Sequence, residues 1–116
     1  RFKPKNVVIH DAARPNFSIR LLKKIIKNLE RNKAVVPIVK PKDSIKYKFK
    51  NQIFNLDRNN SILTQTPQAF RFKDLFNLAI SQKQKITDEA SLFINRNYKV
   101  KFINFEDHQM IGGLLS

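Results

Sequence analysis

Apolar and polar positions recur with different periods in the first 40 residues of the chain. Val7-Val8-Ile9 is a short β-branched run that ends in a polar pair, which predicts a buried strand of a parallel sheet. Ser18 is suited to N-cap a helix that follows it. The apolar face of this helix would hold Ile19, Leu22, Ile25, Ile26 and Leu29. A second strand is predicted over Ala34 to Val39, so the order strand, helix, strand indicates a βαβ unit and an α/β fold.

Further along the chain the apolar period becomes two. Ile45, Tyr47 and Phe49 alternate with lysines, and a second apolar run covers Ile53 to Leu56. This pattern predicts a β-hairpin arm over residues 44–56 with one lysine-coated face, where lysines more often prevent edge pairing than bind a ligand. The arm is too long to bury its apolar side chains against its own domain, so we expect it to pack against a second copy of the chain. These side chains are Ile45, Tyr47, Phe49, Ile53 and Phe54.

The remaining pattern predicts two strands and two helices. A short strand covers roughly Ser61 to Gln65, and a last strand covers Lys99 to Asn104 with Val100 and Phe102 on one face. One helix between them begins near Thr87. Its inward positions would be Ala90, Phe93 and Ile94. The other helix precedes it and would turn inward Phe72, Leu75, Phe76, Ala79 and Ile80.

Composition excludes several classes of site. The chain has no cysteine, which excludes disulfides, thiolate nucleophiles and cysteine-ligated zinc. Two histidines make a poor metal site, so no metal-ligating residues are assigned. The longest apolar run, Ala34 to Val39, is far shorter than the roughly 18 residues of a membrane span. We therefore expect a soluble chain with no membrane partner.

The formal net charge of +14 raises the alternative of a small basic nucleic-acid-binding module. Such a module needs a basic stripe interleaved with exposed aromatic rings, and Ile45 to Lys50 is the candidate segment. However, Lys, Asn, Ile and Phe together make up 51 of the 116 residues, as in a genome poor in G and C. Compositional bias is therefore the favoured explanation of the charge.

Glycine is confined to the C-terminal end of the sequence. Gly112 and Gly113 are the two glycines, so residues 1–111 offer none for a positive-φ turn or for close approach to a phosphate. The first residue is Arg1 and the single methionine is Met110. We interpret the chain as a fragment of a longer protein.

Three polar segments occupy places where open α/β folds keep their sites, after strands or at helix starts. They are residues 10–15, 66–70 and 87–91. Each has a structural alternative, because Asp11 could cap a turn, Thr66 could end a strand and Thr87 could be an N-cap alone. His10 next to Asp11 is better explained as a packed or hydrogen-bonded histidine than as a catalytic base, since adjacent strand residues point to opposite faces.

In this order and spacing the segments resemble the 2-C-methyl-D-erythritol 4-phosphate cytidylyltransferase family, over about residues 6–103. The matching stretches are Val8-Ile9-His10-Asp11-Ala12-Ala13-Arg14-Pro15, Val36-Pro37-Ile38-Val39 with Asp43-Ser44-Ile45-Lys46, Leu56-Asp57-Arg58, Gln65-Thr66-Pro67-Gln68-Ala69-Phe70 and Ile86-Thr87-Asp88-Glu89-Ala90-Ser91. The resemblance implies the C-terminal part of a Rossmann-like nucleotidyltransferase sheet with a protruding β-hairpin arm. The arm, residues 44–56, would be exchanged in a homodimer.

The family joins methylerythritol phosphate to CTP with loss of pyrophosphate, aided by Mg²⁺, in the non-mevalonate route to isoprenoid precursors. By resemblance the catalytic residues would be Asp11, Arg14 and Arg58. Asp11 and Ala12 would contact the nucleotide ribose and the substrate hydroxyls, and Arg58 would hold the substrate phosphate. The substrate-binding set implied by the resemblance is Asp11, Ala12, Arg14, Ser44, Arg58, Thr66 and Thr87. A bacterial cytoplasmic or plastid location is implied as well.

The chain also departs from the family pattern. Ser44 stands where the family has Thr, which keeps the hydroxyl. The family's Gly-rich CTP-binding loop would precede Arg1, so we expect residues 1–116 to be a partial domain without the CTP-binding half and inactive alone. The family's C-terminal functional Lys has no clear counterpart, and Lys101 is not assigned to it. Another nucleotide-sugar-type transferase of the same fold is a third hypothesis.

Overall fold

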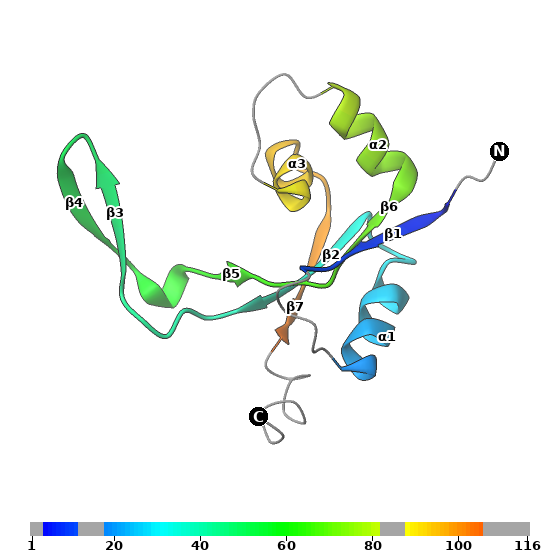
Figure 1. Ribbon diagram of the computed structural model, residues 1–116, viewed down its shortest axis with the longest axis horizontal. Coiled ribbons are helices and arrows are strands. Elements are labelled where there is room, and N and C mark those ends of the chain that lie inside the picture. The colour runs from blue at the N-terminus through cyan, green and yellow to red at the C-terminus, as the bar shows by residue number, and fades with distance from the viewer. Residues whose placement is uncertain (1–3, 12–17, 82–87, 106–116) are drawn as a thin grey trace.

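The computed structural model describes residues 4–11, 18–81 and 88–105, and Figure 1 shows their arrangement. The elements are β1 (Asn6–Ile9), α1 (Ile19–Asn28), β2 (Ala34–Val39), β3 (Ile45–Phe49), β4 (Gln52–Leu56), the short 3₁₀-helix η1 (Arg58–Asn60), β5 (Leu63–Thr64), β6 (Gln68–Arg71), α2 (Phe72–Ser81), α3 (Glu89–Asn95) and β7 (Val100–Asn104). β1, β2, β5, β6 and β7 form one sheet, and β3 pairs with β4 in a separate two-stranded arm.

β1 and β2 run in the same direction, as the predicted βαβ unit requires, but they are not neighbours. β6 lies between them and is antiparallel to both. β7 pairs parallel with β2, and β5 pairs antiparallel with the last two residues of β2. The prediction that Val7-Val8-Ile9 is a buried strand is wrong for the described residues, because β1 ends the order of strands and Val8 is 43% exposed. An edge strand has a neighbouring strand on one side alone, so its other side is not covered by the sheet.

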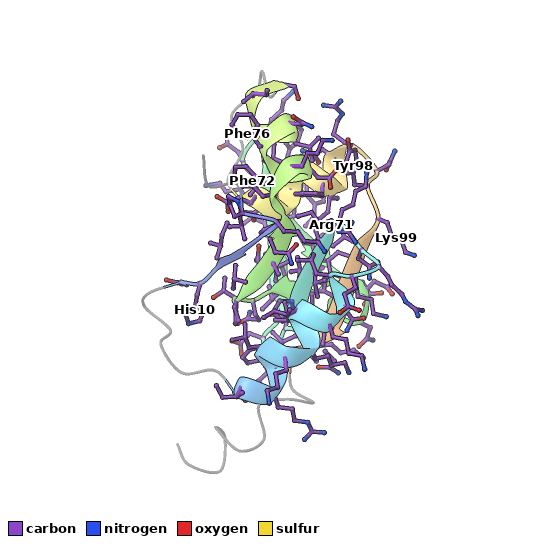
Figure 2. All side chains as sticks on the ribbon, turned by 90° about the vertical axis from the view of Figure 1, so that its right-hand side faces the viewer. His10, Arg71, Phe72, Phe76, Tyr98 and Lys99 are labelled. Carbon is purple, nitrogen blue, oxygen red and sulfur yellow. The ribbon has the colours of Figure 1, made fainter. Side chains whose placement is uncertain are left out.

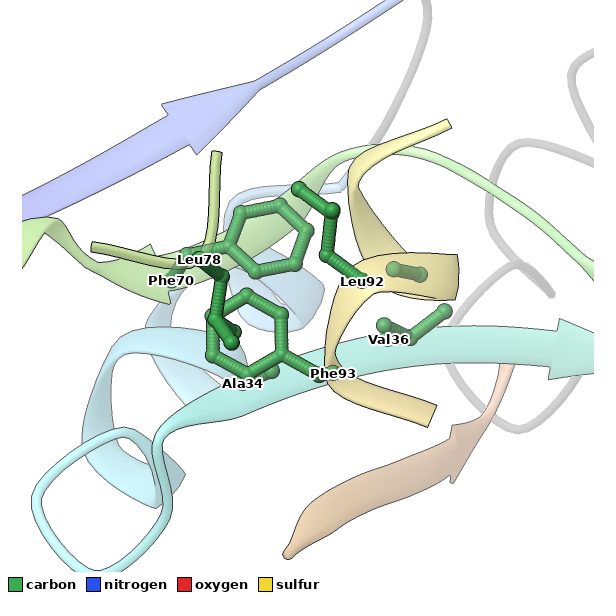
Figure 3. Packing of buried hydrophobic residues seen from close by; sticks show 7 residues of the cluster. Ala34, Val36, Phe70, Leu78, Leu92 and Phe93 are labelled. Atoms are coloured by element: carbon green, nitrogen blue, oxygen red, sulfur yellow. The ribbon is translucent and has the colours of Figure 1, made fainter. Parts of the chain in front are cut away.

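The sheet carries a hydrophobic core on each face, because α1 covers one face and α2 with α3 cover the other (Figure 1). Alternation along β2 divides its side chains, with Ala34 and Val36 on the α2/α3 face and Val35 on the α1 face. Figure 3 shows Phe70 and Phe93 among the residues of the α2/α3 core. Their rings stack with centroids 5.3 Å apart, which ties α3 to the central strand β6.

Helix α1 starts as predicted, but a different stripe of its residues is buried. Ser18 Oγ accepts a hydrogen bond from the Leu21 N–H at 2.9 Å, which confirms the N-cap. Leu21 and Ile25 are fully buried together with Leu29, whereas Ile19 is 63% and Ile26 is 44% exposed. The apolar residues form two adjacent stripes, and the sheet covers only the one with i, i+4, i+8 spacing.

Helices α2 and α3 also bury residues other than those predicted. On α2 the fully buried side chain is Leu78, while Phe76 and Ile80 are exposed. Figure 2 shows Phe72 and Phe76 side by side on this helix, and their rings stack at 5.8 Å. The exposed ring of Phe76 is thus covered in part by the half-buried ring of Phe72 rather than by the sheet.

α3 agrees with the prediction at Ala90 and Phe93, which are buried, but Ile94 is 46% exposed. Its N-cap is Asp88, whose Oδ1 accepts from the Ser91 N–H at 2.8 Å. The predicted first residue, Thr87, lies outside the described residues. In β7 the buried residue is Ile103, on the face opposite to Val100.

The arm has the predicted hairpin form, and its register settles which side chains share a face. Tyr47 pairs with Phe54 and Lys48 pairs with Ile53. Ile53 therefore lies on the lysine face, apart from the other side chains expected to pack against a second copy, because the two-residue turn sets the register. That turn, Lys50-Asn51, has φ values of 48° and 68°, so the chain makes a positive-φ turn without glycine. The apolar face consists of Ile45, Tyr47, Phe49, Phe54 and Leu56.

Among the described residues, no helix has the length and apolar character needed to cross a bilayer.

Candidate active site

Two of the three predicted segments meet where β1 ends and β6 begins. The Asp11 N–H donates to Thr66 Oγ1 at 3.1 Å, and the same oxygen lies 3.1 Å from His10 Nδ1. His10 lies just beyond β1, as Figure 2 shows. These residues are 55 and 56 positions apart in the sequence, so the sheet register brings the two motifs together. We call His10, Asp11 and Thr66 the corner.

The residues on either side of Thr66 in the chain are held in place by the sheet. The Thr66–Pro67 peptide bond is cis, and Pro67 is fully buried. The Gln65 backbone N–H donates to the Pro37 carbonyl of β2 at 2.7 Å, and the side-chain amide of Gln68 donates to the Gln65 backbone carbonyl at 3.0 Å. The hydroxyl is therefore presented by backbone that β2 and β6 fix in place.

Ser44 and Arg58 lie elsewhere, at the base of the arm. Arg58 belongs to η1, and its guanidinium donates to the Lys42 carbonyl at 2.7 Å, which joins the two ends of the arm. Asp57 caps η1 by accepting from the Asn59 N–H at 2.9 Å. Both Ser44 and Arg58 are exposed. In Figure 1 the base of the arm is well separated from the end of β1, so the chain does not bring these two residues to its own corner.

The other predicted site residues are not part of this geometry. Ala12, Arg14 and Thr87 lie outside the described residues, so the structure does not place them. Lys101, which was not assigned a role, is an exposed residue of β7 paired with Val35 of β2.

Two of the three lysines in the candidate segment lie on the face of the arm away from its aromatic rings, and the third, Lys50, lies over the Phe49 ring at 5.3 Å. Lys46 and Lys48 share one face with Ile53, while the aromatic rings of Tyr47 and Phe54 lie on the other. Bases that stack on these rings would therefore leave their phosphates on the side away from the paired lysines. This separation favours the edge-protecting explanation of the lysines.

In the part of the chain that the structure describes, no group of three or more acidic or histidine side chains could hold a metal ion. Asp11 offers one exposed carboxylate at the corner. A single carboxylate fits a Mg²⁺ ion that is bound mainly by substrate phosphates and water, because Mg²⁺ commonly takes only one or two protein carboxylates.

Comparison with known proteins assigns the fold and the family. The sequence profile of 2-C-methyl-D-erythritol 4-phosphate cytidylyltransferase matches residues 2–110. The chain belongs to this family. The match includes both motifs of the corner and the whole arm, so the resemblance noted in the sequence is confirmed.

Relatives and solved structures agree with this assignment. The chain is 47% identical over 102 residues to the bifunctional enzyme IspD/IspF of Pelagibacter ubique, covering 88% of this chain and 28% of that protein. It is 41% identical over 104 residues to the 2-C-methyl-D-erythritol 4-phosphate cytidylyltransferase of Prochlorococcus marinus, covering 85% of this chain and 47% of that protein. The crystal structure of 4-diphosphocytidyl-2C-methyl-D-erythritol synthase from Anaerococcus prevotii superposes with a TM-score of 0.76 at 33% identity, covering 87% of this chain and 49% of that one.

These matches confirm the Rossmann-like nucleotidyltransferase fold, and they show that the chain spans about half the length or less of the relatives it resembles. The cytidylyltransferase family, to which the chain belongs, is a family of nucleotidyltransferases.

Sequence reasoning missed one structural arginine, which lies at the end of β6 away from the corner. Arg71 ends β6, and its guanidinium donates to the Leu29 carbonyl at 3.0 and 3.1 Å and to the Glu30 carbonyl at 2.6 Å. It thereby satisfies backbone acceptors at the C-terminal end of α1. Nothing in the sequence separates Arg71 from the other 22 basic residues, since the contact joins elements 42 positions apart.

Proposed function

We propose that a protein containing this chain is a 2-C-methyl-D-erythritol 4-phosphate cytidylyltransferase of isoprenoid precursor synthesis. The observation that carries the proposal is the corner, where the Asp11 amide and the Thr66 hydroxyl of two separate family motifs share a hydrogen bond of 3.1 Å. A turn cap or a strand end alone would not require the second motif to be in contact with the first.

The proposed reaction joins two anions. A phosphate oxygen of methylerythritol phosphate attacks the α-phosphorus of CTP, and the bond from that phosphorus to the bridging oxygen breaks to release pyrophosphate. Catalysis of this kind depends on positioning and on fixed donors and cations around the phosphates. By resemblance, Asp11, Ala12 and Arg14 bind the substrate hydroxyls and ribose, and the hydroxyls of Thr66 and Thr87 donate to the substrate.

The arm supplies the second part of the proposed site. Its apolar face is about half exposed, with Tyr47 and Phe49 at 50% and Phe54 at 45%. We infer that this face packs against a second copy and that the exchange carries Ser44 and Arg58 to the partner's corner. Because the guanidinium of Arg58 is bonded to the Lys42 carbonyl, it would move with the arm as one unit. A planar guanidinium suits bidentate binding of the substrate phosphate.

The proposal also covers the CTP-binding loop, the Mg²⁺ ion and the location of the enzyme in the cell. The matched region makes up 28% and 47% of the two relatives, and we infer that CTP is bound by a Gly-rich loop in sequence they have beyond it. Mg²⁺ would accompany the nucleotide phosphates, where it would neutralise charge that develops on the leaving pyrophosphate. The relatives named above are bacterial, which favours the bacterial cytoplasm over a plastid.

The test is pyrophosphate release by a protein of the relatives' length that contains this sequence, given CTP, Mg²⁺ and methylerythritol phosphate. We expect turnover there and none with the 116-residue chain. A folded long protein that is inactive with methylerythritol phosphate but active with a sugar phosphate would favour the other transferase hypothesis. Binding of a labelled oligonucleotide that persists at 0.3 M salt would favour the nucleic-acid module, since nonspecific binding weakens steeply with salt.

A further inference from the structure

The hydroxyl of Thr66 takes part in two contacts, and together they limit what else it can bind. Its oxygen accepts the Asp11 N–H at 3.1 Å and lies 3.1 Å from His10 Nδ1. A hydroxyl has one proton to donate and two lone pairs to accept with. The Asp11 amide uses one lone pair, so the contact with His10 uses either the proton or the second lone pair.

The fold explains why a side chain fills this place. β1 and β6 pair as far as Ile9 and Gln68, and continuing that register sets Asp11 opposite Thr66. Pro67 has no N–H, so the backbone ladder cannot continue through it. The Thr66 hydroxyl instead receives the Asp11 amide, and His10 approaches the same oxygen. Whether the hydroxyl proton points to the ring or away from it therefore depends on the tautomer of His10.

We propose that His10 is a positioning residue for substrate binding, in which its Nδ1–H donates to Thr66 and leaves the Thr66 proton for an oxygen of the anionic substrate. The inference rests on the proposed function, because it needs an acceptor such as a phosphate oxygen at the corner. When Nδ1 carries no proton, Thr66 must donate to the ring, and no proton remains for the substrate. Only the tautomer with Nδ1–H makes Thr66 a donor to the substrate.

The kinetic test compares three variants in a protein of the relatives' length. His10→Phe keeps a ring but removes the donor, so nothing holds the Thr66 hydroxyl in the orientation that points its proton at the substrate. We expect this substitution to raise the KM for methylerythritol phosphate about tenfold, the usual scale of one hydrogen bond. The KM for CTP should change less than twofold. His10→Asn is the matched control, since its amide can donate from near the place of Nδ1, and it should stay within about threefold of the unmodified protein.

Thr66→Val completes a double-mutant cycle. If His10 acts through Thr66, adding His10→Phe to Thr66→Val should raise the KM for methylerythritol phosphate no further. Independent, multiplying effects of the two substitutions would overturn the proposal. So would equal losses in the Phe and Asn variants, or equal changes in the KM values of both substrates, because packing alone would then explain the role of His10.

A spectroscopic measurement separates this inference from the proposed function. The chain has two histidines, so the ¹⁵N signals of His10 in the 116-residue chain are assigned by their loss in His10→Asn. We expect a protonated Nδ1 with methylerythritol phosphate added. A bare Nδ1 in a protein whose longer form releases pyrophosphate would overturn the positioning role and leave the proposed function standing. A protonated Nδ1 in a protein whose longer form releases no pyrophosphate would overturn the proposed function and leave only the hydrogen bond from His10 to Thr66.

Discussion

Replacing Tyr47 and Phe49 with serine should separate the proposed dimer into folded monomers. Both rings lie on the apolar face of the arm and are 50% exposed. They stack on each other with centroids 6.2 Å apart, and Tyr47 also contacts Phe54 across the hairpin at 6.4 Å. The arm makes no contribution to either hydrophobic core, so the substitution removes contact surface and leaves the sheet intact.

The size of the effect follows from the exposed area. A Phe or Tyr side chain can bury about 150–250 Å², so two half-exposed rings leave about 200 Å² to be covered by a partner. At about 25 cal/mol per Å², burying this area contributes about 5 kcal/mol per arm. In a two-fold dimer the loss counts twice. Even half of that sum weakens the dissociation constant by more than about a thousandfold.

Sedimentation velocity over a range of concentrations measures this constant in a protein of the relatives' length. Ile53→Ser is the matched control, because Ile53 is 68% exposed but lies on the lysine face of the arm, whereas Tyr47 lies on the apolar face. It should leave the dissociation constant within a few fold. An unmodified protein that is monomeric at all concentrations, or a control that weakens association as much as the double substitution, would refute the reasoning.

Four other substitutions test the corner, the arm and the core separately. Arg58→Lys should raise the KM for methylerythritol phosphate at least tenfold and that for CTP little, because an ammonium cannot bind phosphate in a bidentate way; equal changes would indicate a structural role. Asp11→Asn should lower kcat with an unchanged Tm, whereas a large loss of Tm would support the turn-capping alternative. Arg71→Met should lower the free energy of unfolding, measured in urea, by about 2 kcal/mol, because two backbone carbonyls at the C-terminal end of α1 lose their charged hydrogen-bond donor. Phe93→Ala should lower it by about 3–5 kcal/mol, because the ring is fully buried; a loss below 1 kcal/mol would show that the core relaxes around the cavity.

The sequence was sufficient to predict the elements that local chemistry determines. Ser18 caps α1 because its hydroxyl reaches the Leu21 amide three residues away, and such contacts depend on neighbours alone. The hairpin follows from strict alternation, which only a strand converts into two different faces. The motif residues of the corner were found through their resemblance to the family, and the structure supplied the contact between Asp11 and Thr66.

Predictions failed where a choice depended on distant partners. The pattern of α1 allows two adjacent apolar stripes, and the approach of the sheet selects Leu21 over Leu22. β1 looked like the strand of a parallel sheet because β-branched runs are buried there, but β6, about 60 residues later, inserts between β1 and β2. Ile53 was grouped with side chains that lie on the other face, because the length of the turn, which sets the register, is not visible in the apolar period.

The corner and the base of the arm are positioned by different kinds of interaction, and this difference matters for the proposed site. The corner depends on the pairing of β1 with β6, which the buried rings of Phe70 and Phe93 support from beneath. The base of the arm depends on hydrogen bonds within one exposed segment, from Arg58 to the Lys42 carbonyl and from Asn59 to Asp57. Core stability therefore fixes half of the proposed site, and association of two copies must bring in the other half. Loss of activity on dilution, with no loss of secondary structure, is the behaviour that such a division requires.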